Sequence, residues 1–133
     1  MRMIVVDASA IAEFLLQTEL GSRVERRLYG ANEDLHAPHL LDVEVLSAFR
    51  RLVRAGEMDA GRAEEAVEDL QLLRIVRHGH RDLASRAWEL RQNFTAYDAM
   101  YLALAESLEA VLVTCDRPFA DASKRAVRTE LIR

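Results

Sequence analysis

The stretch Asn93–Ala105 constrains the fold most, because it joins a helix start to an almost continuous apolar run. Thr95 has the residue type of an N-cap, and Asp98 follows three residues later, where a capping-box acid stands. The run Ala99–Ala105 leaves no polar face, and a helix that is apolar on all sides lies in a core. It is shorter than the roughly 20 apolar residues of a membrane span. We therefore expect a central core helix with one acid, Asp98, in its first turn.

Length and cysteine content restrict the class of protein. The chain has 133 residues, which we expect to form one domain, residues 1–133, around a single core. Its one cysteine, Cys115, allows no internal disulfide, and no Cys/His spacing resembles a zinc site. Met1–Val6 lead directly into Asp7 without a basic region and cleavage site. We therefore expect no signal peptide, no membrane association and a cytoplasmic location.

The charge balance bears on nucleic-acid partners. A net charge of −4 argues against a protein that coats nucleic acid, since phosphate neutralisation needs a local basic surface. It is compatible with an enzyme that cuts nucleic acid. Of the 18 basic residues, all except Lys124 are arginine, whose planar fork suits bidentate phosphate contacts. A compositional bias of the source genome explains the arginines equally well.

Short β-rich apolar runs alternate with helical patterns along the chain. The expected strands are Met3–Val6, Leu35–Ala37, Leu73–Val76, Ala110–Val113 and an edge strand within Val127–Ile132. The expected helices are Ile11–Leu16, Leu20–Leu28, His39–Arg54, Ala60–Leu72, Asp82–Arg91, the helix of Asp98, and Pro118–Lys124. This alternation predicts an α/β fold, a three-layer α/β/α sandwich around a mainly parallel sheet.

Four acids occupy positions from which they would converge. Asp7 and Asp116 follow two of the expected strands, and the carboxyl ends of parallel strands meet at one edge, where ligands bind. Asp98 lies in the first turn of its helix, near an element end. Glu44 projects from a largely apolar helix stripe, where a carboxylate is expensive to bury unless something neutralises it. We therefore expect the four carboxylates to share one site.

Such a site needs a cation. Four carboxylates in one pocket would repel one another and raise one another's pKa values. Mg²⁺, or Mn²⁺ in its place, takes oxygen ligands, keeps several waters and binds one or two carboxylates together with substrate phosphates. A metal held this way activates water for in-line attack on phosphorus and stabilises the leaving oxygen. The pattern therefore favours phosphodiester hydrolysis, with the four acids as metal ligands and catalytic groups.

Each acid also has a structural explanation. Asp116 would cap the helix that begins near Pro118, Asp98 would cap its own helix, and Glu44 would pair with an arginine. Taken singly, each acid leaves both interpretations open. Taken together, two strand-end acids and two acids in apolar helices favour the metal site.

Four segments resemble the PIN domain and, within it, the VapC-type toxins of bacterial and archaeal toxin-antitoxin pairs. They are Val5–Ala10, Glu44 in its apolar helix, Thr95–Ala105 and Leu112–Asp116, and they span nearly the whole chain. The resemblance implies that the metal ligands are Asp7, Glu44, Asp98 and Asp116. It also implies that the hydroxyls of Ser9 and Thr114 hydrogen-bond the carboxylates or water.

The same resemblance implies a function. It implies a Mg²⁺-dependent endoribonuclease that acts on tRNA or ribosomal RNA and is commonly a homodimer. A small cognate antitoxin would inhibit it, with its carboxyl-terminal segment docked over the active site. Asp121 matches an additional acid of some members only loosely, and a solvated helix residue is the alternative interpretation. Arg117, which adjoins Asp116, is the residue we favour as a phosphate contact.

Other polar residues fit a metal or RNA site less well. The four histidines form two short pairs, His36 with His39 and His78 with His80. They lack a third ligand at useful spacing, so we interpret them as loop residues. Cys115 is interpreted as a small packed residue. Three arginines of one predicted helix would line an RNA path or complement the helix macrodipole equally well; they are Arg50, Arg51 and Arg54.

Other classes of function also use strand-end acids. A phospho-receiver or similar regulatory module needs its phosphoacceptor after the middle strand, whereas Leu73–Val76 run into Arg77 and His78. A phosphatase with an aspartyl nucleophile would place a second acid two positions after Asp7, where Ser9 stands. A catalytically silent PIN-like interaction module is the third alternative, and the presence of all four acids counts against it.

Overall fold

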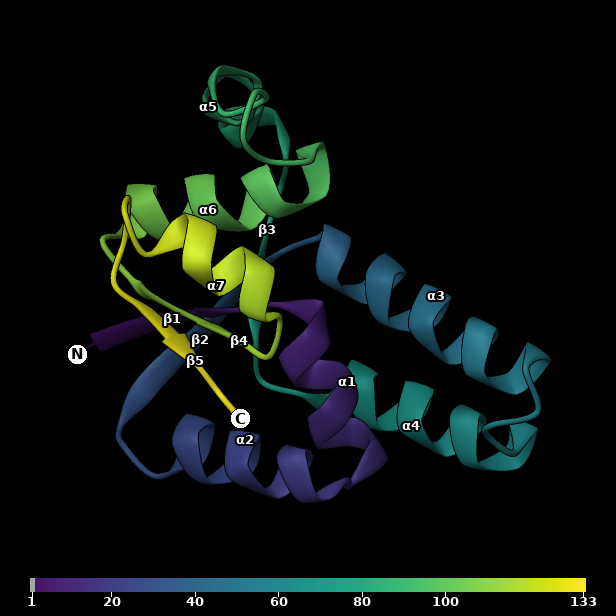
Figure 1. The fold of residues 1–133 in the computed structure, drawn as a ribbon. Helices are drawn as coiled ribbons and strands as arrows, with labels where there is room; N and C mark the ends of the chain where they lie inside the picture. The colour runs from purple at the N-terminus through teal and green to yellow at the C-terminus, as the bar shows by residue number, and fades with distance from the viewer. Residues whose placement is uncertain (1) are drawn as a thin grey trace.

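The sheet at the centre of the molecule is parallel throughout (Figure 1). The computed structural model describes residues 2–133, in which the strands are β1 (Arg2–Val6), β2 (Glu33–Pro38), β3 (Val76–His78), β4 (Val111–Thr114) and β5 (Thr129–Leu131). Their order across the sheet is β3-β2-β1-β4-β5. The middle strand is therefore β1, and chain order reverses between β1 and β4.

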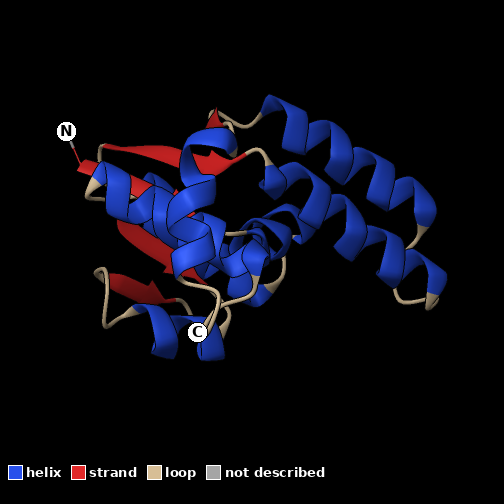
Figure 2. Cartoon of the chain, turned by 90° about the horizontal axis from the view of Figure 1, so that it is seen from above, coloured by secondary structure: helices blue, strands red, loops and turns tan. Residues whose placement is uncertain are grey.

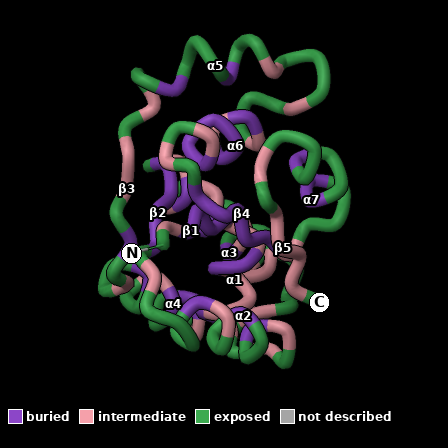
Figure 3. Tube along the Cα trace, turned by 90° about the vertical axis from the view of Figure 1, so that its left-hand side faces the viewer, coloured by how far each residue is buried: buried purple, intermediate pink, exposed green. Residues whose placement is uncertain are grey.

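Helices cover both faces of this sheet, which confirms the predicted three-layer α/β/α sandwich. They are α1 (Ala8–Leu16), α2 (Glu19–Tyr29), α3 (Leu40–Arg54), α4 (Ala60–Leu72), α5 (Ala84–Glu89), α6 (Ala96–Leu108) and α7 (Arg117–Ser123). In the views of Figure 1 and Figure 3, α6 and α7 lie on one face and α1 and α2 on the other. Helices α3 and α4 form a hairpin that extends beyond the sheet (Figure 2).

Helix α6 is the buried centre of its layer, as the apolar run predicted (Figure 3). Its buried residues are Ala99, Tyr101, Leu102, Ala103, Leu104 and Ala105. The side chain of its N-cap, Thr95, accepts a hydrogen bond from the backbone N–H of Asp98 at 3.1 Å. Because α6 leads back into β4, its first turn lies at the carboxyl edge of the sheet. No helix in residues 2–133 is long and apolar enough to cross a bilayer.

The predicted strand Leu73–Val76 was wrong in position. Leu73 ends α4 in an extended conformation, and the N–H of Ile75 bonds to the carbonyl of Leu73 at 3.0 Å. This turn uses the apolar run to cover the core, since Ile75 is buried. Pairing with β2 begins only at Val76. In the strand order β3 lies at the edge of the sheet beside β2, so it is not the middle strand.

The predicted helix Asp82–Arg91 is shorter and less regular than expected. A 3-10 turn at Arg81–Leu83 precedes the short helix α5. Trp88 is 68% exposed, and the guanidinium of Arg91 lies 4.7 Å from its ring centroid. The other elements lie within about three residues of the predicted bounds.

Candidate active site

An open cavity of about 490 Å³ lies at the carboxyl edge of the sheet, where chain order reverses. All four acids singled out in the sequence line it. Asp7 follows the middle strand β1, and Asp116 comes just after its neighbour β4. Glu44 reaches the cavity from α3, and Asp98 from the first turn of α6. The fold therefore brings together four carboxylates that lie far apart in the sequence.

Asp7 is the most buried of the four, with 6% of its surface exposed. Its Oδ1 accepts hydrogen bonds from the Ser9 hydroxyl at 2.7 Å and from the Ala10 N–H at 3.1 Å, and its Oδ2 accepts one from the Thr114 hydroxyl. Burial, and to a smaller extent the charge of Asp116, raise the pKa of Asp7 to about 6, although these three bonds lower it. The hydrogen bonds therefore fix the orientation of the Asp7 carboxylate, but none of them neutralises its charge.

The hydroxyls of Ser9 and Thr114 connect the two strand ends. Their oxygens lie 3.3 Å apart. Ser9 Oγ accepts a bond from the Cys115 N–H, and Thr114 Oγ1 accepts one from the Asp116 N–H, both at 3.0 Å. One network therefore orients the Asp7 carboxylate and the backbone that carries Asp116. Both hydroxyls donate to the Asp7 carboxylate, and their role in supporting a metal ligand stays a prediction.

Glu44 is held by Tyr101, a residue that the sequence analysis did not single out. The Tyr101 hydroxyl donates to Glu44 Oε1 at 2.7 Å, and Tyr101 is 2% exposed. Burial, and then the charge of Glu44, raises the pKa of Tyr101, so the phenol stays protonated and remains a donor. No ion pair between Glu44 and an arginine forms within the described residues. The sequence did offer one signal for this role, because the hydroxyl of Tyr101 is a polar group one turn after Asp98 in an otherwise apolar helix.

Asp98 carries the least compensated charge. Its backbone N–H completes the Thr95 cap, but its carboxylate accepts no hydrogen bond in the part of the chain that the structure describes. Burial raises the pKa of Asp98 to about 6, and the charges of Asp116 and Glu44 add to the rise. A capping box therefore does not explain the carboxylate of Asp98, because only the backbone of this residue takes part in the cap.

Asp116 caps α7, as one interpretation predicted, and its role as a metal ligand stays a prediction. Its Oδ1 accepts a bond from the Phe119 N–H at 3.1 Å and caps α7, while the side chain also lines the cavity. Arg117 is exposed at the first residue of α7 and is not among the residues that line the cavity. Asp121 is also exposed outside it, with its carboxylate 3.7 Å from the Lys124 ammonium.

The donor set fits a hard divalent cation. Within residues 2–133, no three acidic, histidine or cysteine side chains are arranged to enclose an ion on their own. Mg²⁺ does not need such a cage, since it keeps several waters and binds directly to one or two carboxylates. The cavity offers oxygen donors alone, and Arg51 is the one basic residue among those lining it. Burial, and to a smaller extent neighbouring acids, raise the pKa values of Asp7 and Asp98, so ionising these carboxylates costs free energy that a cation would offset.

The histidines and the cysteine lie outside this cavity. His36 Nδ1 and His78 Nε2 are 2.9 Å apart across β2 and β3, and burial, then His78, lowers the pKa of His36. His80 Nε2 accepts a bond from the Leu40 N–H at 3.0 Å at the start of α3. Burial raises the pKa of Cys115 to about 12, so its thiol stays protonated at neutral pH.

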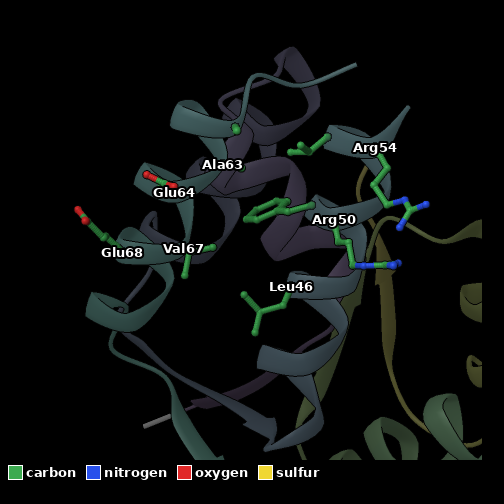
Figure 4. Close-up of a pocket in the computed structure, with 10 residues that line it drawn as sticks. Leu46, Arg50, Arg54, Ala63, Glu64, Val67 and Glu68 are labelled. Atoms are coloured by element: carbon green, nitrogen blue, oxygen red, sulfur yellow. The ribbon is translucent and has the colours of Figure 1, made fainter. Parts of the chain in front are cut away.

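A second cavity, of about 580 Å³, lies between α3 and α4 (Figure 4). Its walls are largely apolar, with Arg50 and Arg54 on α3 and two glutamates on α4. None of the four acids lines it. Of the three arginines considered for an RNA path, only Arg51 lines the acid cavity.

Comparisons with known proteins agree with this fold and site. Residues 4–125 match the PIN domain family. Ribonuclease VapC9 of Mycobacterium tuberculosis is 41% identical over 119 residues, which cover 90% of each chain. VapC20 of Mycobacterium tuberculosis, a sarcin-ricin loop cleaving toxin, superposes with a TM-score of 0.69 at 19% identity, covering 90% of this chain and 94% of its own.

A second similar structure is VapBC2 from Rickettsia felis bound to a DNA fragment from their promoter. It has a TM-score of 0.68 at 13% identity and covers 98% of this chain and 99% of its own. At such identities the two solved structures establish the fold alone. The match over residues 4–125, together with a VapC ribonuclease at 41% identity, establishes the relationship. The chain belongs to the PIN-domain family, among its VapC ribonucleases.

Proposed function

We propose that this protein is a Mg²⁺-dependent endoribonuclease, with Mn²⁺ as a possible substitute, and the toxin of a toxin-antitoxin pair. The observation that carries the proposal is the cavity in which four carboxylates converge, none of them in an ion pair within residues 2–133. The relationship to VapC ribonucleases supports RNA as the substrate. PIN-domain nucleases are generally dependent on a divalent metal, and Mg²⁺ is the ion that suits an open, oxygen-only site.

The residues of the cavity have different roles in the proposed phosphodiester hydrolysis. We assign metal binding to Asp7, Glu44, Asp98 and Asp116. When bound, the cation supplies Lewis-acid chemistry that activates water and stabilises the leaving oxygen. Ser9 and Thr114 hold the Asp7 carboxylate in one orientation, and Tyr101 does the same for Glu44. The carboxylate oxygens of Asp7 and Glu44 are therefore already oriented in the cavity when the substrate binds.

Partners and location complete the proposal. A small cognate antitoxin would dock its carboxyl-terminal segment over the acid cavity, and the enzyme would act as a homodimer in the cytoplasm. The substrate would be tRNA or ribosomal RNA. VapC20, a sarcin-ricin loop cleaving toxin, supports an RNA loop as the target. Arg117 stays a predicted phosphate contact, since it is exposed next to Asp116.

A phospho-receiver function is less favoured, although one reason given against it was wrong. The middle strand is β1, and Asp7 follows it directly. Asp7 is nevertheless 6% exposed, and both of its oxygens accept hydrogen bonds. Such a carboxylate is poorly placed to attack a phosphoryl donor, so the nuclease proposal stands ahead of it.

Purified, antitoxin-free protein should produce discrete new ends in total RNA when Mg²⁺ or Mn²⁺ is present. The carboxylates hold the catalytic ion only while free metal is available, so EDTA should remove these ends. Sequencing of RNA ends from both samples measures the effect and identifies the target. Identical RNA from the two samples, with the protein folded and binding metal, would contradict the proposal.

Tyr101→Phe should lower kcat by roughly 10–100-fold, the usual cost of losing a group that orients a metal ligand. The substitution keeps the buried ring and removes the hydroxyl, which donates to Glu44 and accepts a backbone hydrogen bond from Ala8. Steady-state cleavage kinetics and a thermal melt measure the effect. Tyr29→Phe is the matched control, because Tyr29 is 51% exposed and does not line the cavity. Native kcat in Tyr101→Phe would show that Glu44 needs no such support.

A further inference from the structure

The mouth of the acid cavity carries side chains that metal binding does not use. Tyr97, in the first turn of α6, is 59% exposed, and Val43 of α3 is 61% exposed, yet both line the cavity. Arg51 lies two turns after Glu44 on α3 and lines it as well. An aromatic ring, an apolar side chain and a guanidinium therefore line the same cavity as the four carboxylates.

Resting on the proposed function, we propose that Tyr97 and Arg51 form a subsite for unpaired RNA. The Tyr97 ring stacks on a nucleobase, with Val43 as a second apolar contact, and Arg51 binds a neighbouring phosphate. The site therefore takes single-stranded or looped RNA in preference to a duplex.

The ring of Tyr97 is exposed and does not belong to the hydrophobic core. Its helix neighbours Ala99 and Tyr101 are buried in the core, whereas Tyr97 projects outside it. Within residues 2–133 it forms no ring pair with another aromatic side chain. A nucleobase offers a flat face for such a ring, and stacking tolerates any base. Tyr97 also precedes Asp98, so a stacked base would lie next to the acids.

Two features explain the preference for unpaired RNA: the size of the cavity, and whether the faces of the base are free or already stacked. A cavity of about 490 Å³ lies within the roughly 300–1,000 Å³ of small-ligand pockets, which is suitable for a nucleotide and too small for a duplex. In a duplex both faces of a base are already stacked, so only an unpaired base is free to meet Tyr97.

Arg51 is the arginine that the geometry selects. Adjacent Arg50 lines the cavity between α3 and α4 (Figure 4), whereas Arg51 lines the acid cavity. Within the described residues Arg51 forms no ion pair, even though acids line the same cavity. Its planar fork is therefore free for the bidentate phosphate contact that guanidinium groups make.

Binding of a short, labelled RNA of mixed sequence tests the role of the ring. Fluorescence anisotropy in Mg²⁺, with Asp98→Asn in every protein so that the RNA stays intact, compares the single strand with its duplex. The single strand should bind more tightly, and Tyr97→Ala should weaken its binding by about tenfold or more. Tyr97→Phe, which restores the ring, should recover most of the loss.

Trp88→Ala is the matched control for the ring. Trp88 is 68% exposed on α5 and does not line the acid cavity, so its removal should leave RNA binding unchanged. Equal binding of strand and duplex, absent binding, or equal losses in Tyr97→Ala and Trp88→Ala would overturn the proposal.

Salt dependence tests the phosphate contact. Each phosphate contact to a single strand contributes about 0.7 to the slope of log affinity against log salt. Arg51→Ala should lower that slope by about this amount, and Arg50→Ala should not change it. Equal slopes in the two variants would overturn the assignment of Arg51.

Cleavage kinetics without the Asp98 substitution separate this subsite from the proposed function. Tyr97→Ala should raise KM for single-stranded RNA more than it lowers kcat, because it removes binding and leaves the acids in place. Ring-dependent binding in a protein that cuts no RNA would overturn the nuclease and keep the subsite. Cleavage by Tyr97→Ala with native KM would keep the nuclease and overturn the subsite.

Discussion

Asp98→Asn should lower the rate of metal-dependent RNA cleavage by roughly 10²–10⁴-fold while the protein stays folded, because one anionic group at the reaction centre is lost. The amide keeps the shape of the side chain and removes its charge. The Thr95 cap uses the backbone N–H of Asp98, which the substitution leaves in place. Cleavage rates on the identified RNA and a thermal melt are the measurements.

The effect of this substitution on stability has a defined sign. Burial and neighbouring acids raise the pKa of Asp98 from 3.8 to about 6, so the folded state binds this proton more tightly than the unfolded state. Above about pH 6 the ionised carboxylate therefore destabilises the metal-free fold. Asp98→Asn removes that cost, and its Tm at pH 7.5 in EDTA should equal or exceed the native value.

Asp121→Asn is the matched control for Asp98→Asn. Asp121 is exposed on α7, lies near Lys124 and does not line the acid cavity. The control should cleave RNA at the native rate, which also tests whether this acid joins the site. Unfolding of Asp98→Asn, with Asp121→Asn folded, would instead favour the capping interpretation of Asp98.

The positions of the acids could be predicted because local rules determine them. Apolar β-rich runs ending in an acid place Asp7 and Asp116 at the carboxyl edge of any parallel sheet that contains both strands. The Thr95 cap and the apolar run place Asp98 at the start of a buried helix. Each inference needs only neighbours in sequence and the direction of strands, so it did not depend on the order of strands in the sheet.

The predictions that failed needed tertiary information. An apolar run such as Leu73–Val76 reads equally as a strand or as a buried turn, and packing against the core decides between them. The contact between Tyr101 and Glu44 depends on how α6 lies against α3, which no local pattern specifies. Strand order is also absent from local patterns, so placing Asp7 after the middle strand required the structure.

Adding Mg²⁺ should raise the Tm of the native protein much more at pH 7.5 than at pH 5. Burial raises the pKa of both Asp7 and Asp98 from 3.8 to about 6. Between about pH 4 and pH 6 the metal-free folded state holds more protons than the unfolded state, so its free energy of unfolding falls as pH rises. Above pH 6 both carboxylates are ionised and exert their full destabilising effect, which a bound cation would relieve.

At pH 5 protons compete with the metal for the same oxygens, so the stabilisation should shrink. At pH 7.5, free metal at 100 times its Kd stabilises the folded state by about 2.7 kcal/mol. Thermal melts in Mg²⁺ and in EDTA, matched for ionic strength with NaCl, measure the difference at each pH. Asp98→Asn should lose most of the Mg²⁺-induced shift, and Asp121→Asn should keep it. An equal shift at both pH values, or in both variants, would place the bound ion outside the acid cavity.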